Sequence, residues 1–301
     1  MAEANASRVL ISGASGLIGS ALVPSLEAGG YEVTRLVRGA ASGERQIAWD
    51  PARPLAPELV SGFDAVIHLS GESIVGRWTE AKKKRIVESR VGATRTLSEA
   101  LTKAPQRPRI FLCASAVGYY GDRGDEILRE ESASGEQFAS ELCRQWEAAS
   151  QSAEAAGIRT AHMRLGAVLS AHGGALREML TPFQLGLGGK IGNGRQWMPW
   201  IAIADVVGAM LWMLSHDLSG AVNVVSPNPV TNAEFAKTLA SVLSRPAIFP
   251  VPAFAVRLAF GDMGKELLLA SQRVEPAKLV ASGYGFRQPD LRKALEGILK
   301  R

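Results

Sequence analysis

The amino-acid sequence predicts an α/β fold: a doubly wound, mainly parallel sheet of seven strands, joined to a small, mostly helical C-terminal lobe. Short apolar runs alternate with helical patterns through the first 225 residues, as in βαβ units. After about residue 226, helical stretches are interrupted by proline and glycine. With 301 residues, of which 47% are apolar and 21% charged, the chain can bury a core without disulfides and does not have the composition of a disordered protein.

The seven strands are expected in order where short apolar runs occur: Arg8–Ser12, Glu32–Val37, Gln46–Trp49, Ala65–Leu69, Arg109–Ala114, Arg159–Arg164 and Val222–Val225. Helical patterns lie between several of them: Leu17–Ala28, Thr79–Ala104 and Glu136–Ala156. Each of these helices is long enough to connect two parallel strands and to cover one face of the sheet.

The C-terminal lobe is expected to begin with a helix that runs from a capping box at Thr231 and Glu234 towards Leu243. Upstream of it, the segment Gly186–Gly194 contains five glycines and is predicted to be a loop. Loops of this composition often border binding sites.

Charge and cysteine content exclude several classes of function. The net charge of +5 is mild for this length, and the densest basic run, 82–85, is interpreted as the solvated face of a helix, so we expect no nucleic-acid partner. Cys113 and Cys143 have neither CxxC spacing nor nearby histidines, and they are expected to be free thiols with no metal site. Without an apolar stretch that could span a membrane or an evident signal peptide, we expect a cytoplasmic protein.

A glycine-rich turn follows the first strand and precedes the first helix. Gly13, Gly16 and Gly19 have the GxxGxxG spacing, in which glycines allow a tight turn, close approach of a pyrophosphate and close packing of helix on strand. The phosphates would lie at the helix N-terminus. The sequence therefore predicts a dinucleotide site whose turn residues are Gly13, Ser15, Gly16, Leu17, Ile18 and Gly19.

The end of the second strand favours NADP(H) over NAD(H). An acidic residue would bind the ribose hydroxyls of NAD at this point, but the sequence contains Arg35 and Arg38 instead. A guanidinium suits a 2′-phosphate, with Arg38 as the first candidate and Arg35 as the second. The alternative is that both are surface arginines without a ligand. Asp50, at the end of the third strand, is a candidate acceptor for the adenine amino group.

The glycine turn and three further motifs resemble the extended short-chain dehydrogenase/reductase superfamily: DAVIHLSG at 64–71, Ser115 followed by GYYG at 118–121, and WIAIADVV at 200–207. The loop at 185–200 and SQRVEPAKL at 271–279 resemble the subgroup called epimerase family proteins, which carry a C-terminal domain of unknown function. The resemblance covers essentially the whole chain.

The resemblance implies a Rossmann fold and assigns roles by position. Residues 1–170, with a return segment at 200–226, would form the NADP-binding domain, and 171–199 with 227–301 the substrate-side lobe. Leu69, Ser70 and Gly71 would contact the adenosine and ribose side, and Arg164 would lie near the nicotinamide. A homodimer is also expected, since extended members of the superfamily are often dimers.

The catalytic pattern of the superfamily is incomplete. Members that transfer hydride have a tyrosine followed four residues later by a lysine, but the matching helix here offers Phe138 and Leu142. The remaining candidates for acid/base chemistry are Tyr119, Tyr120 and, after them, Glu141, with Ser115 as a hydrogen-bonding partner. His68, a lone histidine on an apolar strand, is expected to be a packed residue.

Three interpretations stay open at this point. The protein is an oxidoreductase or epimerase-like enzyme on a small carbonyl or sugar-like substrate, a regulatory protein that senses NADPH without turnover, or a nucleotide-sugar epimerase. Lys190, Arg195 and Trp197, which follow the glycine-rich loop, are candidates for binding the unknown small-molecule substrate. Alternatively, Trp197 packs the lobe onto the sheet together with Met198 and Trp200.

Overall fold

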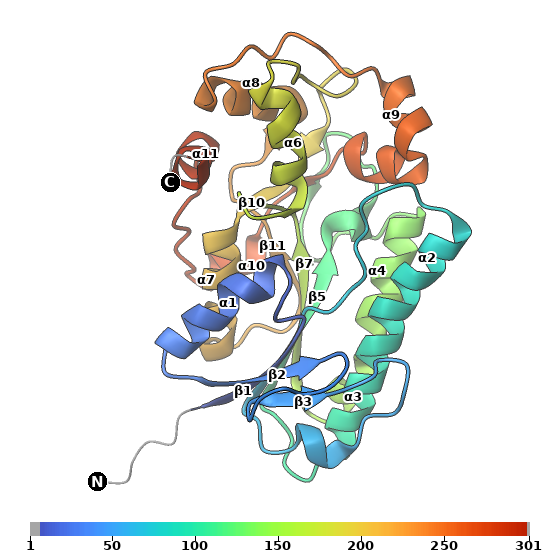
Figure 1. Ribbon diagram of the computed structural model, residues 1–301, viewed down its shortest axis with the longest axis vertical. Coiled ribbons are helices and arrows are strands. Elements are labelled where there is room, and N and C mark those ends of the chain that lie inside the picture. Colours follow the sequence, from blue (N-terminus) through green and yellow to red (C-terminus); the bar gives the residue numbers. More distant parts are fainter. Residues whose placement is uncertain (1–6, 300–301) are drawn as a thin grey trace.

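The computed structural model describes residues 7–299 and confirms the predicted α/β fold (Figure 1). Its main sheet has seven strands in the order β11-β7-β5-β4-β1-β2-β3, and every neighbouring pair is parallel. These strands are β1 (Arg8–Ser12), β2 (Glu32–Val37), β3 (Gln46–Ala48), β4 (Ala65–His68), β5 (Ile110–Ala116), β7 (Arg159–Leu165) and β11 (Gly220–Val224). Residues 1–6, which belong to the segment used to judge a signal peptide, lie outside the described residues.

Helices cover both faces of the sheet, as expected for a doubly wound fold. Alternate strand residues point to opposite faces: Val9 packs with α1 (Leu17–Ala28) and α7 (Ile203–Ser215), whereas Leu10 packs with α3 (Ala93–Lys103). Figure 1 shows α1 and α7 together on one side of the sheet and α3 on the other. Because neighbouring strands are all parallel, the carboxyl ends of the seven strands lie along one edge of the sheet.

Two of the predicted helices are each divided in the structure. The helix expected over 79–104 consists of α2 (Glu80–Val87), a π-helical turn η2 (Glu88–Gly92) and α3. The helix expected over 136–156 consists of α4 (Phe138–Ala148) and α5 (Gln151–Ala155). The second break occurs at Ser150, whose buried hydroxyl lies 2.6 Å from Nε2 of His162, a contact that no pattern within one helix could reveal.

The lobe lies beyond the carboxyl edge of the sheet, at the top of Figure 1. Its helices are α6 (Gly174–Gln184), α8 (Asn232–Val242), α9 (Ala253–Phe260) and α11 (Leu291–Leu299), and its short strand pairs join β8 (Ala167–Leu169) to β10 (Trp200–Ala202) and β9 (Trp197–Met198) to β12 (Val230–Thr231). The predicted capping box at Thr231 and Glu234 is present. Short 3₁₀ turns occur at η1 (Pro57–Val60) and η3 (Val117–Tyr120), and a second π-helical turn at η4 (Gly264–Leu268).

After the lobe, the chain returns to the sheet. Strand β13 (Arg273–Val274) pairs with β6 (Ile127–Leu128), and α10 (Ala277–Ala281) packs beside β11. Asp205 on α7 is buried, and its carboxylate accepts the backbone N–H groups of Arg287 at 2.7 Å and Gln288 at 2.9 Å. The division into a cofactor-binding and a substrate-side region stays a prediction, since it depends on where ligands bind.

Within residues 7–299, no helix has both the length and the apolar character needed to cross a membrane. The same residues contain no group of three or more histidine, cysteine or acidic side chains placed to hold a metal ion. Cys113 and Cys143 are buried and free, as predicted.

Candidate cofactor site and the neighbouring acid/base position

The three glycines of the first turn have different roles. Gly13 has φ +74°, and a Cβ there would lie 2.7 Å from the carbonyl carbon of Leu69, so both backbone conformation and space require glycine. A Cβ on Gly19 would lie 2.3 Å from the carbonyl oxygen of Gly13. Gly16 is different: its φ is −75°, and a Cβ would have only one neighbour, the Gly13 oxygen at 3.3 Å. The space beside Gly16 is therefore open, and a ligand can approach its backbone there.

The glycine turn places the uncapped N-terminus of α1 at the carboxyl edge of the sheet. Helix α1 has neither a side-chain cap at Gly16 nor an acidic residue in its first turn. Ser15 and Gly16 are exposed, and Leu17 and Ile18 are half-buried. Backbone N–H groups and the positive end of the helix dipole are thus available to a phosphate. A turn in which side chains are excluded and N–H groups are free fits the pyrophosphate of a dinucleotide.

The two candidate arginines on β2 lie in different surroundings. Arg35 forms an ion pair with Glu27 at 3.1 Å and is half-buried. Arg38 is exposed just beyond the strand, and within the part of the chain that is described it has no carboxylate within 4.0 Å. Arg38 is therefore the guanidinium that is free to bind a phosphate. Asp50 is exposed, accepts the backbone N–H of Ala52 at 3.0 Å and lies 3.3 Å from the guanidinium of Arg53.

The loop after β4 packs directly against the glycine turn. A Cβ on Gly13 would also lie 2.8 Å from the backbone nitrogen of Ser70, so Leu69 and Ser70 form the adjoining wall of the site, and Gly71 is exposed beside them. His68, the last residue of β4, is fully buried, and its Nδ1 lies 2.6 Å from Oγ of Ser12. Burial lowers the pKa of His68 to about 4. As expected, it is a packed, neutral residue.

Arg164 lies in the core instead of presenting its guanidinium to a ligand. It is 3% exposed, and it forms a two-point ion pair with Glu147 at 2.9 Å for both contacts. A third donor reaches the carbonyl oxygen of Glu130 at 3.0 Å. Although burial acts to lower it, the Glu147 carboxylate raises the pKa of the Arg164 guanidinium. Only the backbone of this position is left to approach a cofactor.

The three catalytic candidates surround this ion pair and differ in access. Ser115 is buried and donates its hydroxyl to Glu147 at 2.7 Å. Tyr120 is fully buried, donates to Asn223 at 2.7 Å and accepts from Arg164 at 3.0 Å. Burial raises the pKa of the Tyr120 phenol to about 12. Both hydroxyls are thus buried and hydrogen-bonded within the protein, and their part in acid/base chemistry stays a prediction.

Tyr119 is the candidate that the structure leaves accessible. It is half-buried, its ring lies face to face with the Arg164 guanidinium at 3.4 Å, and no hydrogen bond occupies its hydroxyl within the described residues. Glu141 faces outward on α4, where hydrogen bonds from Gln145 and Arg144 lower the pKa of its carboxyl group. Of the three hydroxyl candidates, Tyr119 is the one that is partly exposed and whose hydroxyl has no hydrogen bond to a described residue.

The C-terminal segment covers the position where the tyrosine of the superfamily would stand. Phe138 packs edge to face on Trp78 at 5.2 Å, and Met263 belongs to the same apolar cluster. Glu266 accepts the backbone N–H of Ala139 at 2.8 Å and so caps α4. An ion pair between Lys83 of α2 and Asp262 at 2.8 Å also joins the C-terminal segment to this region. Leu142 is buried on the same helix.

The three substrate candidates do not converge on one pocket. Lys190 lines a groove of about 520 Å³ along α8, which Arg195 and Trp197 do not line. Arg195 is exposed. Trp197 donates its indole N–H to Asp125 at 2.8 Å, and the guanidinium of Arg273 lies over its ring at 4.6 Å. These contacts favour the packing role of Trp197.

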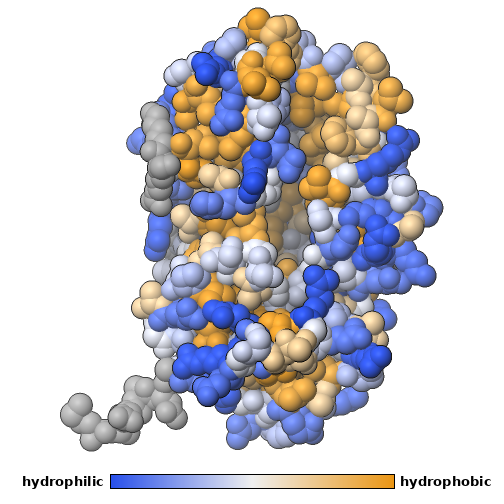
Figure 2. All heavy atoms as spheres, viewed as in Figure 1, coloured by the Kyte–Doolittle hydropathy of each residue, from blue (hydrophilic) through white to orange (hydrophobic). Residues whose placement is uncertain are grey.

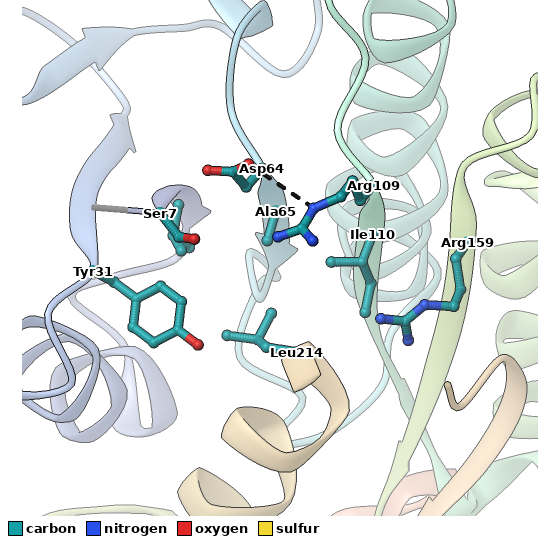
Figure 3. Close-up of a pocket in the computed structure, with 9 residues that line it drawn as sticks. Ser7, Tyr31, Asp64, Ala65, Arg109, Ile110, Arg159 and Leu214 are labelled. Atoms are coloured by element: carbon teal, nitrogen blue, oxygen red, sulfur yellow. Dashed lines mark ion pairs between the residues drawn. The ribbon is translucent and has the colours of Figure 1, made fainter. Parts of the chain in front are cut away.

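A separate cavity of about 230 Å³ lies at the opposite edge of the sheet (Figure 3). It is lined by the starts of β1, β4, β5 and β7, and the ion pair between Arg109 and Asp64 at 3.9 Å crosses its rim. In open α/β sheets, ligands bind at the carboxyl ends of the strands. Figure 2 shows a hollow at the carboxyl ends of the strands, between the sheet and the lobe that carries α6 and α9.

Sequence reasoning missed Glu147 and Arg90, a half-buried residue of η2 whose guanidinium lies over the Trp146 ring at 5.1 Å. A signal for Glu147 existed, because an arginine inside an apolar strand such as Arg164 requires a buried carboxylate. Nothing in the sequence identifies which acidic residue it is, since the pair joins α4 to β7.

Comparison with known proteins gives matches along almost the whole chain. The model of the NAD dependent epimerase/dehydratase family matches residues 9–225, and a domain of unknown function, DUF1731, matches residues 251–298. Epimerase family protein Mb2239 of Mycobacterium bovis is 40% identical over 95% of this chain and 96% of its own length, and epimerase family protein SDR39U1 of Homo sapiens is 39% identical over 97% and 99%. The crystal structure of human SDR39U1 (isoform 2) with NADPH superposes with a TM-score of 0.89 at 38% identity, covering 98% of this chain and 99% of that one.

Proposed function

Because the chain belongs to the NAD dependent epimerase/dehydratase family of extended short-chain dehydrogenases/reductases, we propose that it binds NADP(H) at the glycine turn. Gly16 opens its side to the pyrophosphate, and the N-terminus of α1 supplies N–H donors. The observation that carries the preference for the phosphorylated cofactor is the exposed Arg38 at the end of β2, which has no ion pair with any residue in 7–299. The human relative crystallised with NADPH supports the same assignment.

The test of cofactor choice is a titration of the purified protein with NADPH and NADH, followed by nicotinamide fluorescence. We expect NADPH to bind ten- to a hundredfold more tightly, since a charge-assisted contact of a partly exposed guanidinium contributes about 1.5–3 kcal/mol. Equal affinities for the two cofactors would refute the role of Arg38.

For the reaction, we propose reduction of a small carbonyl or sugar-like compound, with Tyr119 as the proton donor. NADPH supplies the hydride when it is bound. Tyr119 has the free phenol at this edge, whereas Ser115 and Tyr120 are held by Glu147 and Asn223. A neutral phenol can donate its proton to the carbonyl oxygen as the carbonyl carbon accepts the hydride.

A second candidate function, an NADPH-sensing protein without turnover, is favoured by a specific observation. The position of the acid/base tyrosine holds Phe138, and the C-terminal segment covers it through Met263 and Glu266. A screen of aldehydes, ketones and nucleotide sugars, followed at the nicotinamide absorbance, separates the two. Oxidation of NADPH by any of them supports the enzyme; tight NADPH binding with no response from any of them supports the sensor.

A further inference from the structure

Arg90 is a cation that has no ion pair with any residue that the structure describes. Its guanidinium lies over the Trp146 ring at 5.1 Å, and its hydrogen bond, to the carbonyl oxygen of Ile86, is long at 3.5 Å. Among residues 7–299, no carboxylate lies within 4.0 Å of it; Glu72, in the neighbouring loop, is bound instead by Lys82 at 2.9 Å. Burial lowers the pKa of Arg90. A guanidinium has five N–H donors, so most of the hydrogen-bonding capacity of Arg90 is unused.

The local backbone is arranged around this side chain. Arg90 lies in the π-helical turn η2, which interrupts the helix that the sequence predicts as continuous; such turns are frequent at functional sites. The same turn fixes the loop after β4, because the backbone N–H of Glu72 donates to Oγ of Ser89 at 3.0 Å. The turn therefore connects Arg90 to the loop that faces the glycine turn.

Gly71 is the glycine that makes room for the guanidinium. Its φ is not positive, so its backbone conformation would accept any residue. A Cβ at Gly71 would, however, lie 3.1 Å from Cζ of Arg90 and 3.2 and 3.3 Å from its two terminal nitrogens. The absence of a side chain at this exposed position therefore leaves room for the guanidinium to pack against the backbone of the loop.

The order of the strands fixes which part of a dinucleotide would meet Arg90. The sheet order places four strands next to one another along the carboxyl edge: β2, followed by Arg38; β1, followed by the glycine turn; β4, followed by Gly71; and then β5. A cofactor with its 2′-phosphate at β2 and its pyrophosphate at β1 must extend its second half over β4 and β5. The hydroxyl groups of the second ribose are then the oxygen acceptors nearest to Arg90.

We propose that Arg90 binds the ribose on the nicotinamide side of the dinucleotide and fixes that half of the cofactor on the sheet edge. This role rests on the proposed NADP(H) binding. It makes Arg90 a cofactor-binding residue that the sequence pattern does not indicate.

The experiment compares three ligands that share the adenosine 2′-phosphate. NADPH and 2′-phospho-ADP-ribose contain the second ribose, whereas 2′-phospho-ADP contains both phosphates of the pyrophosphate but no second ribose. For Arg90→Met, we expect calorimetric titration to show NADPH and 2′-phospho-ADP-ribose weakened about tenfold or more, with 2′-phospho-ADP unchanged within about twofold. Arg90→Lys, which keeps the charge but not the planar fork, should lie between.

Matched variants separate binding from folding. Arg107→Met removes an arginine that bonds to Ala156 just before β5, at the opposite edge, and it should leave all three affinities unchanged. If Arg90→Met does not fold, as judged by thermal melting, Gly71→Ala gives the second test, because its methyl group displaces the guanidinium and should produce the same ligand pattern.

Each outcome decides the proposal. Equal losses for all three ligands, or no loss for any, overturn the role of Arg90 while the proposed cofactor stands. A wild-type protein that binds none of the three ligands overturns the proposed function and this inference together.

Discussion

The contrast between Gly16 and Gly13 provides the sharpest test of the cofactor site. Gly16→Val places a side chain on the open side of the turn, where φ of −75° and ψ of 175° suit any residue and the new Cβ meets a single atom at 3.3 Å. Gly13→Ala places a methyl group 2.7 Å from the Leu69 carbonyl carbon at φ +74°. The first change should affect the ligand, and the second should affect the fold.

The expected magnitudes differ accordingly. For Gly16→Val, loss of two charge-assisted hydrogen bonds to phosphate at about 1.5–3 kcal/mol each corresponds to more than a hundredfold weaker NADPH binding, with a change in Tm below about 4 °C. For Gly13→Ala, the left-handed conformation costs about 1–2 kcal/mol, and the backbone contact adds to it. We expect Tm to fall by about 6 °C or more.

Fluorescence titration with NADPH and thermal melting followed by circular dichroism measure the two effects separately. A folded Gly16→Val protein that binds NADPH within about threefold of the wild type would refute the phosphate site. A loss of Tm in Gly16→Val as large as that in Gly13→Ala would show that the two glycines do not have separate roles.

Three further predictions concern single side chains. Arg38→Ala should weaken NADPH binding by about ten- to a hundredfold and leave NADH binding unchanged in parallel titrations; equal losses would contradict its contact with the 2′-phosphate. With a responsive carbonyl substrate, Tyr119→Phe should reduce the rate at least about tenfold at unchanged NADPH affinity; a wild-type rate in this variant would exclude Tyr119 as the proton donor. Tyr120→Phe should instead lower the free energy of unfolding by about 1–3 kcal/mol, because it loses the hydrogen bond to Asn223. Burial lowers the pKa of His68 to about 4 from the ordinary value of 6.5, so the folded state binds fewer protons than the unfolded state between these pH values. The free energy of unfolding therefore includes about 3 kcal/mol from His68 above pH 6.5, and this amount is lost as the pH falls towards 4. Urea unfolding at pH 7 and pH 5 should show a smaller difference for His68→Gln than for the wild type, and identical differences would contradict the buried neutral state.

The fold was predictable because its signals are local. The buried strand from Arg8 to Ser12 and the helix from Leu17 to Ala28 end where the sequence indicates, since glycine turns bound both. The same holds for the capping box at Thr231, where four residues of sequence contain the whole hydrogen-bond pattern.

The breaks in the two long helices could not be predicted in this way. Each is set by partners far away in sequence: Ser89 in η2 binds the backbone of Glu72, and Ser150 binds His162 on a different element. A helical pattern contains no record of such contacts.

The catalytic candidates show the same limit. Motif order located Ser115, Tyr119 and Tyr120 near one edge of the sheet, yet their hydroxyl groups have different partners because of a buried ion pair from two other elements. Accessibility, which decides which phenol can meet a ligand, depends on this long-range packing and not on the motif.

The buried carboxylate of Asp205 has a consequence for the architecture of the chain. Its acceptor oxygens are satisfied by N–H groups of Arg287 and Gln288, which belong to the separately matched segment 251–298. A chain shortened to residues 1–250 would lose both of these donors, and breaking the contacts of a buried carboxylate costs several kcal/mol. The terminal segment is therefore not a module that recombination could exchange freely; calorimetry should show one melting transition, and gene truncations that remove the tail should yield protein that proteases degrade.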